Sequence, residues 1–302
     1  MKNILDYSEK VEKALKNNQV VVALESTIIA HGFPYPDNIK LAMDLEKQTE
    51  ESQVTPATIA VIDGSIKVGL NREELEFIAK SKEVKKASLR DLPVLLAKGL
   101  SGATTVAATM KIAYLAGIDV FVTGGIGGVH QGAENTFDIS ADLKALSQYP
   151  IIVVCAGAKS VLDLAKTKEV LESKGVPVLG YKTNKLPAFY IQDSGLKADY
   201  RIEDGKEAAE IIKVNRRLKN KNGILLTVPI PKEDELNQKE FNKIIKRLNR
   251  EVTEHKIKGK AITPYLLDRI KDETKGESLK ANISLVKNNL AVGIDVAKNL
   301  KD

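Results

Sequence analysis

The chain has 302 residues, of which 43% are hydrophobic and 28% charged, and its formal net charge is +6. This composition is typical of a soluble globular protein that is long enough to bury a sizeable core. The single cysteine excludes an intramolecular disulfide framework and suits a reducing compartment. No apolar run approaches the roughly 18 residues of a membrane span, and the N-terminus has no apolar signal core. We therefore expect a cytoplasmic protein that does not bind membranes.

Much of the positive charge comes from lysines scattered along polar segments, and the sequence pI is near 9.0. Only 5% of the residues are aromatic and none is tryptophan, so side chains that could stack on bases are scarce. We expect no nucleic-acid partner. The charge is compatible with a small phosphorylated substrate.

Apolar and amphipathic segments alternate through the first part of the chain. We predict, in turn, a helix, a strand, a helix and a strand at residues 7–16, 20–24, 38–53 and 58–62. Asp63-Gly64 separates the last strand from the apolar run 66–68, and two short apolar runs around Asp-Gly predict a β-hairpin. A hairpin here makes the sheet mixed and not purely parallel.

Strands and helices continue to alternate beyond the hairpin. We predict helices at 72–79, from about Asp91 and Pro93, and at 106–116, 141–147, 161–173 and 206–218. The predicted strands lie at 84–89, 120–123, 151–155, 178–181 and 223–227. Residues 185–198 are irregular, and three helices near 239–255, 264–273 and 279–298 end the chain.

This alternation implies crossover connections and a sheet covered by helices on both faces. No composition shift, Gly/Ser linker or internal repeat marks a domain boundary. We therefore predict one domain of residues 1–302 with an α/β fold. Its architecture is a three-layer α/β/α sandwich with a mixed central sheet and C-terminal helices.

Two strand ends carry ionisable side chains, and ligands of α/β proteins collect where strands end in loops. Lys159 follows the apolar strand 151–155 and three small residues. If its stem is buried and its amine lies at a helix N-terminus, the neutral, nucleophilic form is favoured; a snorkelling lysine is the alternative. Glu25 ends the strand 20–24, where partial desolvation would suit a general acid, although a carboxylate that points into water fits equally well.

A glycine-dense loop precedes Lys159 in the chain. Five of the nine residues 124–132 are glycine, which lets backbone N–H groups approach an anion or a base edge. A tight turn without a ligand is the alternative. His130 lies in this loop, and Asp138 and Asp142 follow four residues apart; they could bind Mg²⁺ or Mn²⁺, or cap a helix. Of the other candidates, Cys155 is better explained as a small core residue.

Several common motifs are absent. The sequence contains no Rossmann G-x-G-x-x-G, no Walker A loop, no H-E-x-x-H and no G-x-S-x-G elbow. These absences disfavour dehydrogenases, P-loop NTPases, zinc hydrolases and serine esterases.

Taken together, ordered blocks of the sequence resemble the pseudouridine-5′-phosphate glycosidase family, also called indigoidine synthase A-like. The resemblance covers residues 20 to 289, nearly the whole chain. Its blocks are ALESTII (23–29), HG (31–32), PATIA (56–60), RDLP (90–93), GATTV (102–106), the loop 123–142, CAGAK (155–159), PAF (187–189), PIP (229–231) and SLKAN (278–282). So many blocks in order are far more specific than any single motif.

The resemblance implies a metal-dependent enzyme that reversibly cleaves the C–C glycosidic bond of pseudouridine 5′-phosphate into uracil and ribose 5-phosphate. It implies that Glu25 is the proton donor, that Lys159 is the nucleophile of a covalent imine, and that Asp138 binds one Mn²⁺ per subunit. It further implies a homotrimer. The implied substrate contacts are Lys86, Val106, Ser140, Ala141 and Asp142, with further contacts from Thr105, Thr123, His130 and Asn282.

Two positions depart from the family's pattern. Leu89 precedes Arg90 where the family has an arginine pair, and Gln131 stands where arginine is frequent. Either change could weaken the affinity for phosphate, because a guanidinium binds phosphate with two hydrogen bonds. Two other functions stay open: a lysine-dependent aldolase or N-glycosidase acting on another ribose phosphate, and a non-catalytic sugar-phosphate sensor.

Overall fold

The structure is a computed structural model that describes residues 4–255, 257 and 262–301, and in this part of the chain eleven strands form one sheet. The main path of the sheet has the order β1-β4-β3-β2-β7-β8-β11-β9-β10. In chain order these strands are β1 (Leu5–Tyr7), β2 (Val21–Glu25), β3 (Thr55–Ile62), β4 (Ser65–Val68), β7 (Val120–Val122), β8 (Ile152–Cys155), β9 (Val178–Tyr181), β10 (Tyr200–Ile202) and β11 (Ile224–Thr227). The two other strands, β5 (Lys85–Ala87) and β6 (Gly102–Thr104), pair with each other, and β6 also pairs with β3.

The sheet is mixed, as predicted. From β3 through β2 and β7 to β10 neighbouring strands are parallel, whereas β4 and β6 run antiparallel to β3. The predicted hairpin joins β3 to β4. Asp63 (φ 48°) and Gly64 (φ 74°) are both left-handed, which is the backbone that a tight two-residue hairpin turn requires.

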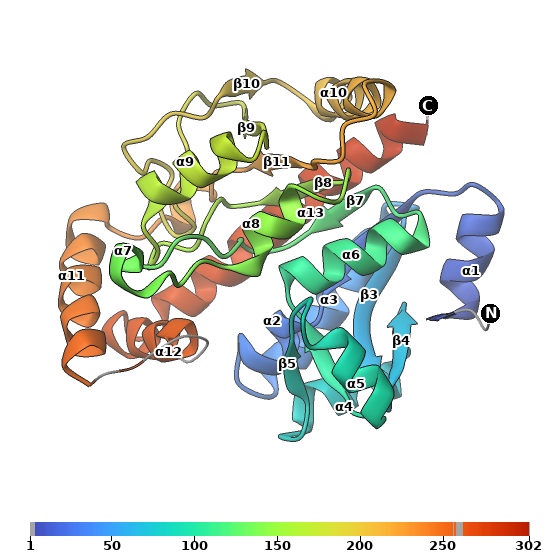
Figure 1. Cartoon of the computed structure of the whole chain (residues 1–302), viewed down its shortest axis with the longest axis horizontal. Helices are drawn as coiled ribbons and strands as arrows, with labels where there is room; N and C mark the ends of the chain where they lie inside the picture. Colours follow the sequence, from blue (N-terminus) through green and yellow to red (C-terminus); the bar gives the residue numbers. More distant parts are fainter. Residues whose placement is uncertain (1–3, 256, 258–261, 302) are drawn as a thin grey trace.

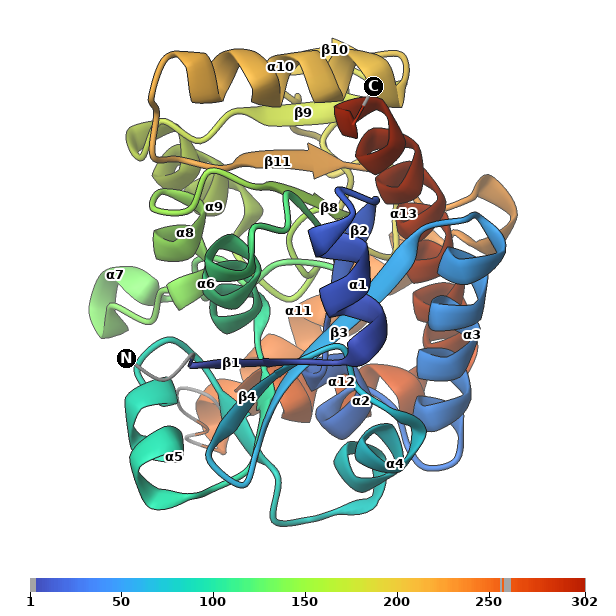
Figure 2. The same cartoon turned by 90° about the vertical axis from the view of Figure 1, so that its right-hand side faces the viewer.

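Helices cover both faces of the sheet, so the three-layer prediction is confirmed. Figure 2 shows α3 (Asp37–Glu51) and α13 (Glu277–Lys301) on one side of the sheet, with α6 (Val106–Ala116), α8 (Ala141–Leu146) and α9 (Leu164–Ser173) on the other. The remaining helices are α1 (Glu9–Lys16), α2 (Thr27–His31), α4 (Arg72–Lys80), α5 (Leu92–Lys98), α7 (Ala133–Thr136), α10 (Gly205–Arg217), the 3-10 turn η1 (Lys232–Asp234), α11 (Gln238–Glu254) and α12 (Ile262–Glu273). Figure 1 shows how α11 and α12 lie beside the N-terminal half of α13.

Apolar segments explain which helices are most deeply buried. The alanine-rich α6 has seven buried residues and packs on the sheet and against α8. The last helix, α13, is not a peripheral cap, because it packs directly on β2, β7 and β8. Among the described residues, one large apolar cluster extends from Leu5 to Ala297, and a smaller one includes Ile29, Leu75 and Ile78.

The structure corrects the sequence analysis at short elements. The three-residue strands β1, β6 and β10 and the short helices α2 and α7 were not predicted. The helix predicted at 161–173 begins only at Leu164, because the side chain of Asp163 accepts a hydrogen bond from Lys166 N (3.0 Å) and caps it there. Lys159 therefore lies in a loop and not at a helix N-terminus.

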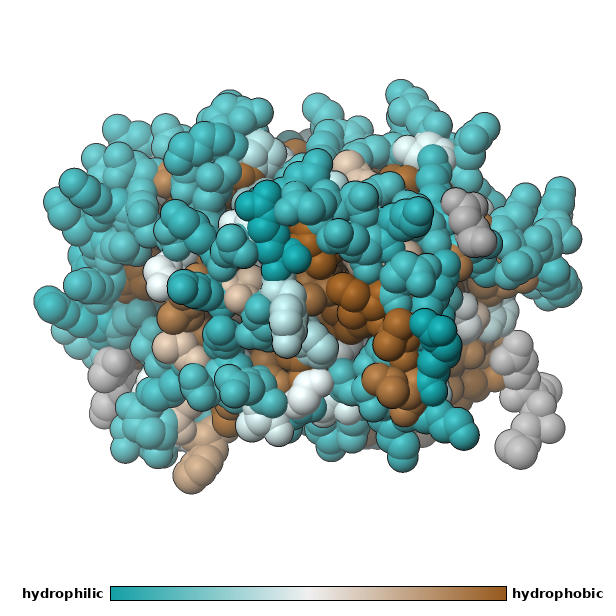
Figure 3. All heavy atoms as spheres, turned by 90° about the horizontal axis from the view of Figure 1, so that it is seen from above, coloured by the Kyte–Doolittle hydropathy of each residue, from teal (hydrophilic) through white to brown (hydrophobic). Residues whose placement is uncertain are grey.

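The surface agrees with the composition. No helix in the described residues is long and apolar enough to cross a membrane. The face seen in Figure 3 is mostly hydrophilic, with apolar side chains showing mainly near its middle. The prediction of one domain for residues 1–302 includes residues 1–3, 256, 258–261 and 302, which lie outside the described residues, and it stays a prediction.

Candidate active site

A cleft lies where the order of the strands reverses. From β2 the chain continues to β3 on one side, and from β7 it continues to β8 on the other. Ligands of open α/β sheets bind at such a switch point, outside the carboxyl ends of the strands. The cleft has a volume of about 630 Å³. It is lined by Glu25, Thr27, Lys86, Ser88, Leu89, Arg90, Asp91, Thr105, Val106, Gly127, His130, Asp138, Ile139, Ser140, Ala141, Asp142, Lys144, Lys159 and Leu162.

Glu25, the last residue of β2, is only 8% exposed. The Thr123 hydroxyl, just after β7, donates a hydrogen bond to Glu25 Oε1 across the switch point. Burial raises the pKa of Glu25, since desolvation outweighs the opposing charges of Lys159 and Lys86 and the hydrogen bond from Thr123. A carboxyl group whose protonated form is favoured in a cleft can deliver a proton to a substrate.

Lys159 reaches the cleft from a loop that is held against the glycine loop. Lys159 N donates to Ile126 O (3.1 Å), and Ile126 N donates to Gly157 O (3.1 Å). Gly157 has φ 85°, and a Cβ there would lie 2.3 Å from Pro187 O, so the tight turn before the lysine requires glycine. These contacts fix the backbone from which the amine extends.

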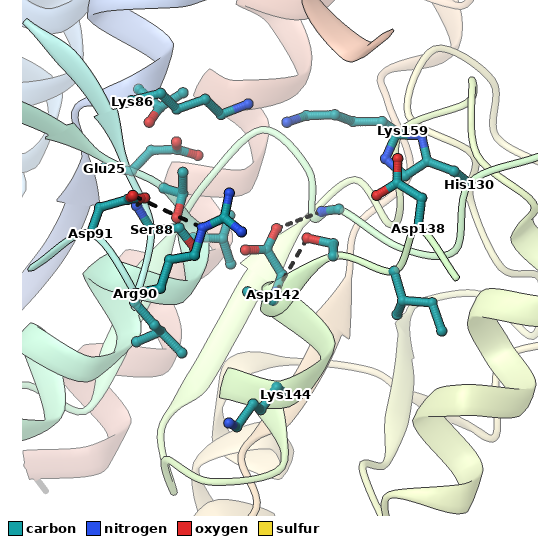
Figure 4. A pocket seen from close by; sticks show the side chains of 18 of the residues that line it. Glu25, Lys86, Ser88, Arg90, Asp91, His130, Asp138, Asp142, Lys144 and Lys159 are labelled. Carbon is teal, nitrogen blue, oxygen red and sulfur yellow. Dashed lines mark hydrogen bonds and ion pairs between the residues drawn. The ribbon is translucent and has the colours of Figure 1, made fainter. Parts of the chain in front are cut away.

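Lys86 enters the cleft from a different part of the sheet. It lies on β5, paired with Ala103 of β6. Figure 4 shows the amines of Lys86 and Lys159 pointing toward each other, with the carboxyl group of Glu25 beside them. Two amines and one carboxyl group thus converge from three separate elements. This arrangement combines a potential acid and nucleophile with positive charge for an anionic substrate.

Asp142 ties the glycine loop to α6. Its Oδ1 accepts a hydrogen bond from Ala107 N (2.9 Å) and its Oδ2 from Gly127 N (2.8 Å). The side chain of Ser140 caps α8 by accepting from Asp142 N (3.2 Å). The loop N–H of Gly127 is therefore bound to a carboxylate of this chain. Asp138 lies outside α8, so the two aspartates do not share a helical face.

His130 and Asp138 lie together on the side of the cleft near Lys159 (Figure 4). His130 N donates to Asp138 O (3.0 Å). Burial lowers the pKa of His130; Asp138 opposes this shift, and the charges of Lys86 and Lys159 add to it. Asp138 Oδ2 is buried and has no hydrogen-bond partner. A cleft with an unpartnered carboxylate oxygen has the donor type that Mn²⁺ binds.

The chain offers no complete protein cage for a metal ion at this position. Within the described residues, no three or more His, Cys, Asp and Glu side chains are grouped so that they could hold an ion. An ion bound by Asp138 would therefore take most of its ligands from water and substrate. The residues present fit that open kind of site and not a closed one.

Comparisons with known proteins agree with this geometry. The family described as indigoidine synthase A like protein matches residues 10–299. The chain belongs to this family. It is 58% identical over 300 residues to a protein from Caldanaerobacter subterraneus named pseudouridine-5′-phosphate glycosidase, covering 99% of this chain and 98% of the relative. A protein of the same name from Clostridium botulinum is 52% identical over 301 residues, with 99% and 98% coverage.

Two solved structures have the same fold as this member of the indigoidine synthase A-like family. The prealnumycin C-glycosynthase AlnA, crystallised with ribulose 5-phosphate, is 36% identical with a TM-score of 0.92 and covers 100% of this chain and 98% of its own. An indigoidine synthase A-like protein from Thermotoga maritima is 32% identical with a TM-score of 0.89, covering 99% and 97%. The resemblance found in the sequence is thus confirmed at the level of family and fold.

Of the twelve residues that the sequence analysis selected in this family member, ten line the cleft. They are Glu25, Lys86, Thr105, Val106, His130, Asp138, Ser140, Ala141, Asp142 and Lys159. Thr123 lies behind Glu25 and is bound to it. Asn282 is not part of the lining: it is 7% exposed on α13, and its Oδ1 lies 3.5 Å from where a Cβ of Gly124 would be. Cys155 is a core residue, as expected, and burial raises its pKa to about 12.

The other nine lining residues were not selected as sites. They are Thr27, Ser88, Leu89, Arg90, Asp91, Gly127, Ile139, Lys144 and Leu162. Six of them belong to sequence blocks or to the noted departure, so position in a block was an available signal. The side chain of Asp91 accepts a hydrogen bond from Ser88 N (2.9 Å), another residue of the lining. It makes no capping hydrogen bond to α5. Ser88, Lys144 and Leu162 lie outside the blocks and carry no pattern that would have identified them.

Proposed function

We propose that this protein reversibly cleaves the C–C glycosidic bond of pseudouridine 5′-phosphate, giving uracil and ribose 5-phosphate. The names of relatives at 52–58% identity support this substrate. The observation that carries the proposal is the convergence of Glu25, Lys86 and Lys159 in one cleft. A carboxyl group with a raised pKa and a lysine amine are the two groups that opening of a ribose ring and imine formation require.

The first step opens the sugar ring. Glu25 gives its proton to the ring oxygen O4′, and the bond between C1′ and O4′ breaks. The neutral amine of Lys159 forms a bond to C1′, and the proton that it loses on attack returns to the Glu25 carboxylate. The product is a ring-opened ribose chain that carries both the lysine nitrogen and uracil on C1′. Burial of Glu25 supports this role, because it raises the pKa of the carboxyl group that is to donate the proton.

The second step breaks the C–C bond. The lone pair of the lysine nitrogen forms the C1′=N iminium, and the electron pair of the C1′–C5 bond passes to uracil C5, which takes up a proton from water. Uracil leaves, and water hydrolyses the iminium to free Lys159 and the aldehyde of ribose 5-phosphate. Lysine is the residue type that can form this imine, which explains why no heteroatom leaving group is needed.

The other residues of the cleft are proposed to orient the substrate. Lys86 supplies positive charge for the phosphorylated ribose, together with contacts from Ser140, Ala141 and Asp142. Val106 lies at the start of α6 and gives the base an apolar contact. The contacts proposed for Thr105, Thr123, His130 and Asn282 depend on the family resemblance. For Thr105 there is one supporting feature, a buried hydroxyl without a hydrogen-bond partner in the cleft.

We also propose that Asp138 holds a Mn²⁺ ion. When bound, such an ion supplies positive charge that organises substrate and water around the loop. Its support is the unpartnered Asp138 Oδ2. Manganese binding followed by electron paramagnetic resonance tests this: Asp138→Asn should release the ion, and full retention by that variant would refute the assignment.

We further propose, from the family resemblance, that the protein is a homotrimer and that it is located in the cytoplasm. Light scattering tests the first, because a trimer has three times the chain mass of 33.0 kDa.

Release of uracil from pseudouridine 5′-phosphate, measured by chromatography, tests the function. We expect turnover by the wild type and none with uridine 5′-phosphate, which has an N–C glycosidic bond. Glu25→Gln should lower kcat by about 10²- to 10⁴-fold, the usual contribution of a general acid. Cleavage of uridine 5′-phosphate instead would favour the N-glycosidase alternative, and binding of ribose 5-phosphate without any turnover would favour the sensor.

A further inference from the structure

We propose that Ser26 and Thr104 are positioning residues that fix the place of Glu25 relative to Lys86 in the cleft. The inference rests on the proposed function, because Glu25 is taken there as the acid. Both residues are completely buried, and neither lines the cleft. Their hydroxyl groups join β2, which ends in Glu25, to β6, the strand beside Lys86.

The two hydroxyls meet at one carbonyl oxygen. Ser26 Oγ donates to Ile59 O (2.7 Å) and Thr104 Oγ1 donates to the same oxygen (2.6 Å). Ile59 is the residue of β3 that is paired with Glu25. Thr104 N in turn donates to Ser26 Oγ (2.9 Å), and Thr109 Oγ1 donates to Thr104 Oγ1 (2.9 Å). Every hydroxyl hydrogen in this group has an acceptor, and the Ser26 and Thr104 hydroxyl oxygens themselves lie 3.3 Å apart.

The cluster replaces a strand pairing that is missing. The antiparallel register of β3 with β6 pairs Ala60 with Ala103, and one step further Ile59 would face Thr104. No such pair forms, and the hydroxyls bind Ile59 O instead. Because β5 and β6 lie off the main path of the sheet, their position relative to Glu25 depends strongly on this junction.

Hydrogen bonds from Thr27 strengthen the same junction. The hydroxyl of Thr27 donates to Thr104 O (2.8 Å), with a longer contact to Ala103 O (3.2 Å). Ser26 follows Glu25 directly and has helical φ and ψ (−108° and −9°), so its hydrogen bonds fix the turn by which the chain leaves the Glu25 carboxyl. Loss of a hydroxyl here shifts the carboxyl group relative to Lys86 without removing any group that touches the substrate.

The test compares three threonine variants in the uracil-release assay. Thr104→Val removes the hydroxyl at nearly constant volume, Thr104→Ser retains it, and Thr49→Val is the matched control. Thr49 is equally buried, donates one hydroxyl bond to Leu45 O (2.7 Å), and lies on α3 away from the cleft. A misplacement of about 1 Å can cost about 100-fold in rate, so we expect Thr104→Val to lower kcat by about 10- to 100-fold. KM should change less than kcat, Thr104→Ser should restore turnover, and Thr49→Val should leave it unchanged.

A mutant cycle separates positioning from general destabilisation. If Thr104 acts through Glu25, then Thr104→Val should cause little further loss in a Glu25→Gln background, measured by end-point chromatography. Two results would overturn the proposal. One is that Thr104→Val lowers kcat by the same factor in the wild-type and Glu25→Gln backgrounds, and the other is that Thr104→Val is no slower than Thr49→Val. If Thr104→Val does not fold, Ser26→Ala takes its place with the same expectations. A wild type that releases no uracil would overturn the proposed function, and this proposal with it.

Discussion

The two backbone hydrogen bonds to Asp142 lead to a quantitative prediction for stability. Asp142 is 6% exposed, and Asp142→Ala would leave the N–H groups of Ala107 and Gly127 without acceptors. A buried donor without a partner costs about 1–3 kcal/mol, so the variant should lose about 2–6 kcal/mol of unfolding free energy. Because domains are stable by only about 5–15 kcal/mol, this is a large share of the total.

Urea unfolding followed by circular dichroism measures this loss, since the chain has no tryptophan for fluorescence. Asp204→Ala is the matched control, because Asp204 is an exposed carboxylate that accepts a single bond, from Glu207 N (2.9 Å), as the N-cap of α10. Removal of such a cap costs about 0.5–2 kcal/mol. If Asp142→Ala proves no more destabilising than Asp204→Ala at equal protein concentration, the anchoring role of Asp142 is wrong.

Three further predictions follow from the site. Burial holds the pKa of Glu25 above its usual value, so the folded protein loses stability as pH rises above the ordinary glutamate pKa of about 4.5. The melting temperature of Glu25→Gln should therefore rise relative to that of the wild type as pH increases from this point, and a difference that narrows with pH would contradict this. Gly127→Ala would place a Cβ 2.3 Å from Ser140 Oγ and 2.9 Å from Asp142 Oδ2. The variant should therefore lose about 1–3 kcal/mol of unfolding free energy in urea and turn over more slowly, and wild-type values for both would refute the close fit. Chelation should lower uracil release, with added Mn²⁺ restoring it in the wild type but not in Asp138→Asn; activity that chelators leave untouched would make Asp138 a residue without a metal role.

The sequence predicted the parts of this molecule that depend on local pattern. Apolar strands followed by amphipathic helices identified the parallel half of the sheet, and Asp63-Gly64 identified the hairpin. The rule that ligands collect at the carboxyl ends of strands brought Glu25 and the Thr123 loop together, and the structure confirms that they meet. Because β2 and β7 are neighbours in the sheet, their ends are close even though the two residues are 98 positions apart.

Features that depend on long-range pairing could not be predicted. Lys86 was implied only by the family resemblance: it enters the cleft because β5 pairs with β6, and a three-residue strand such as β6 has too few residues to show a period of two. The loop conformation of Lys159 depends on contacts with Ile126 and Pro187, whereas the sequence alone favoured a helix start. The partners of Asp142 are two backbone groups in distant segments, and backbone groups leave no signal in a sequence.

Covalent capture of the sugar at Lys159 tests the central claim most directly. The protein is incubated with ribose 5-phosphate, reduced with borohydride and digested, and the peptides are analysed by mass spectrometry. We predict one stable sugar-phosphate adduct, on Lys159, that is lost in Lys159→Ala and retained in Lys144→Ala, which changes a second lysine of the cleft. An unmodified Lys159, or labelling spread evenly over surface lysines, would contradict the account.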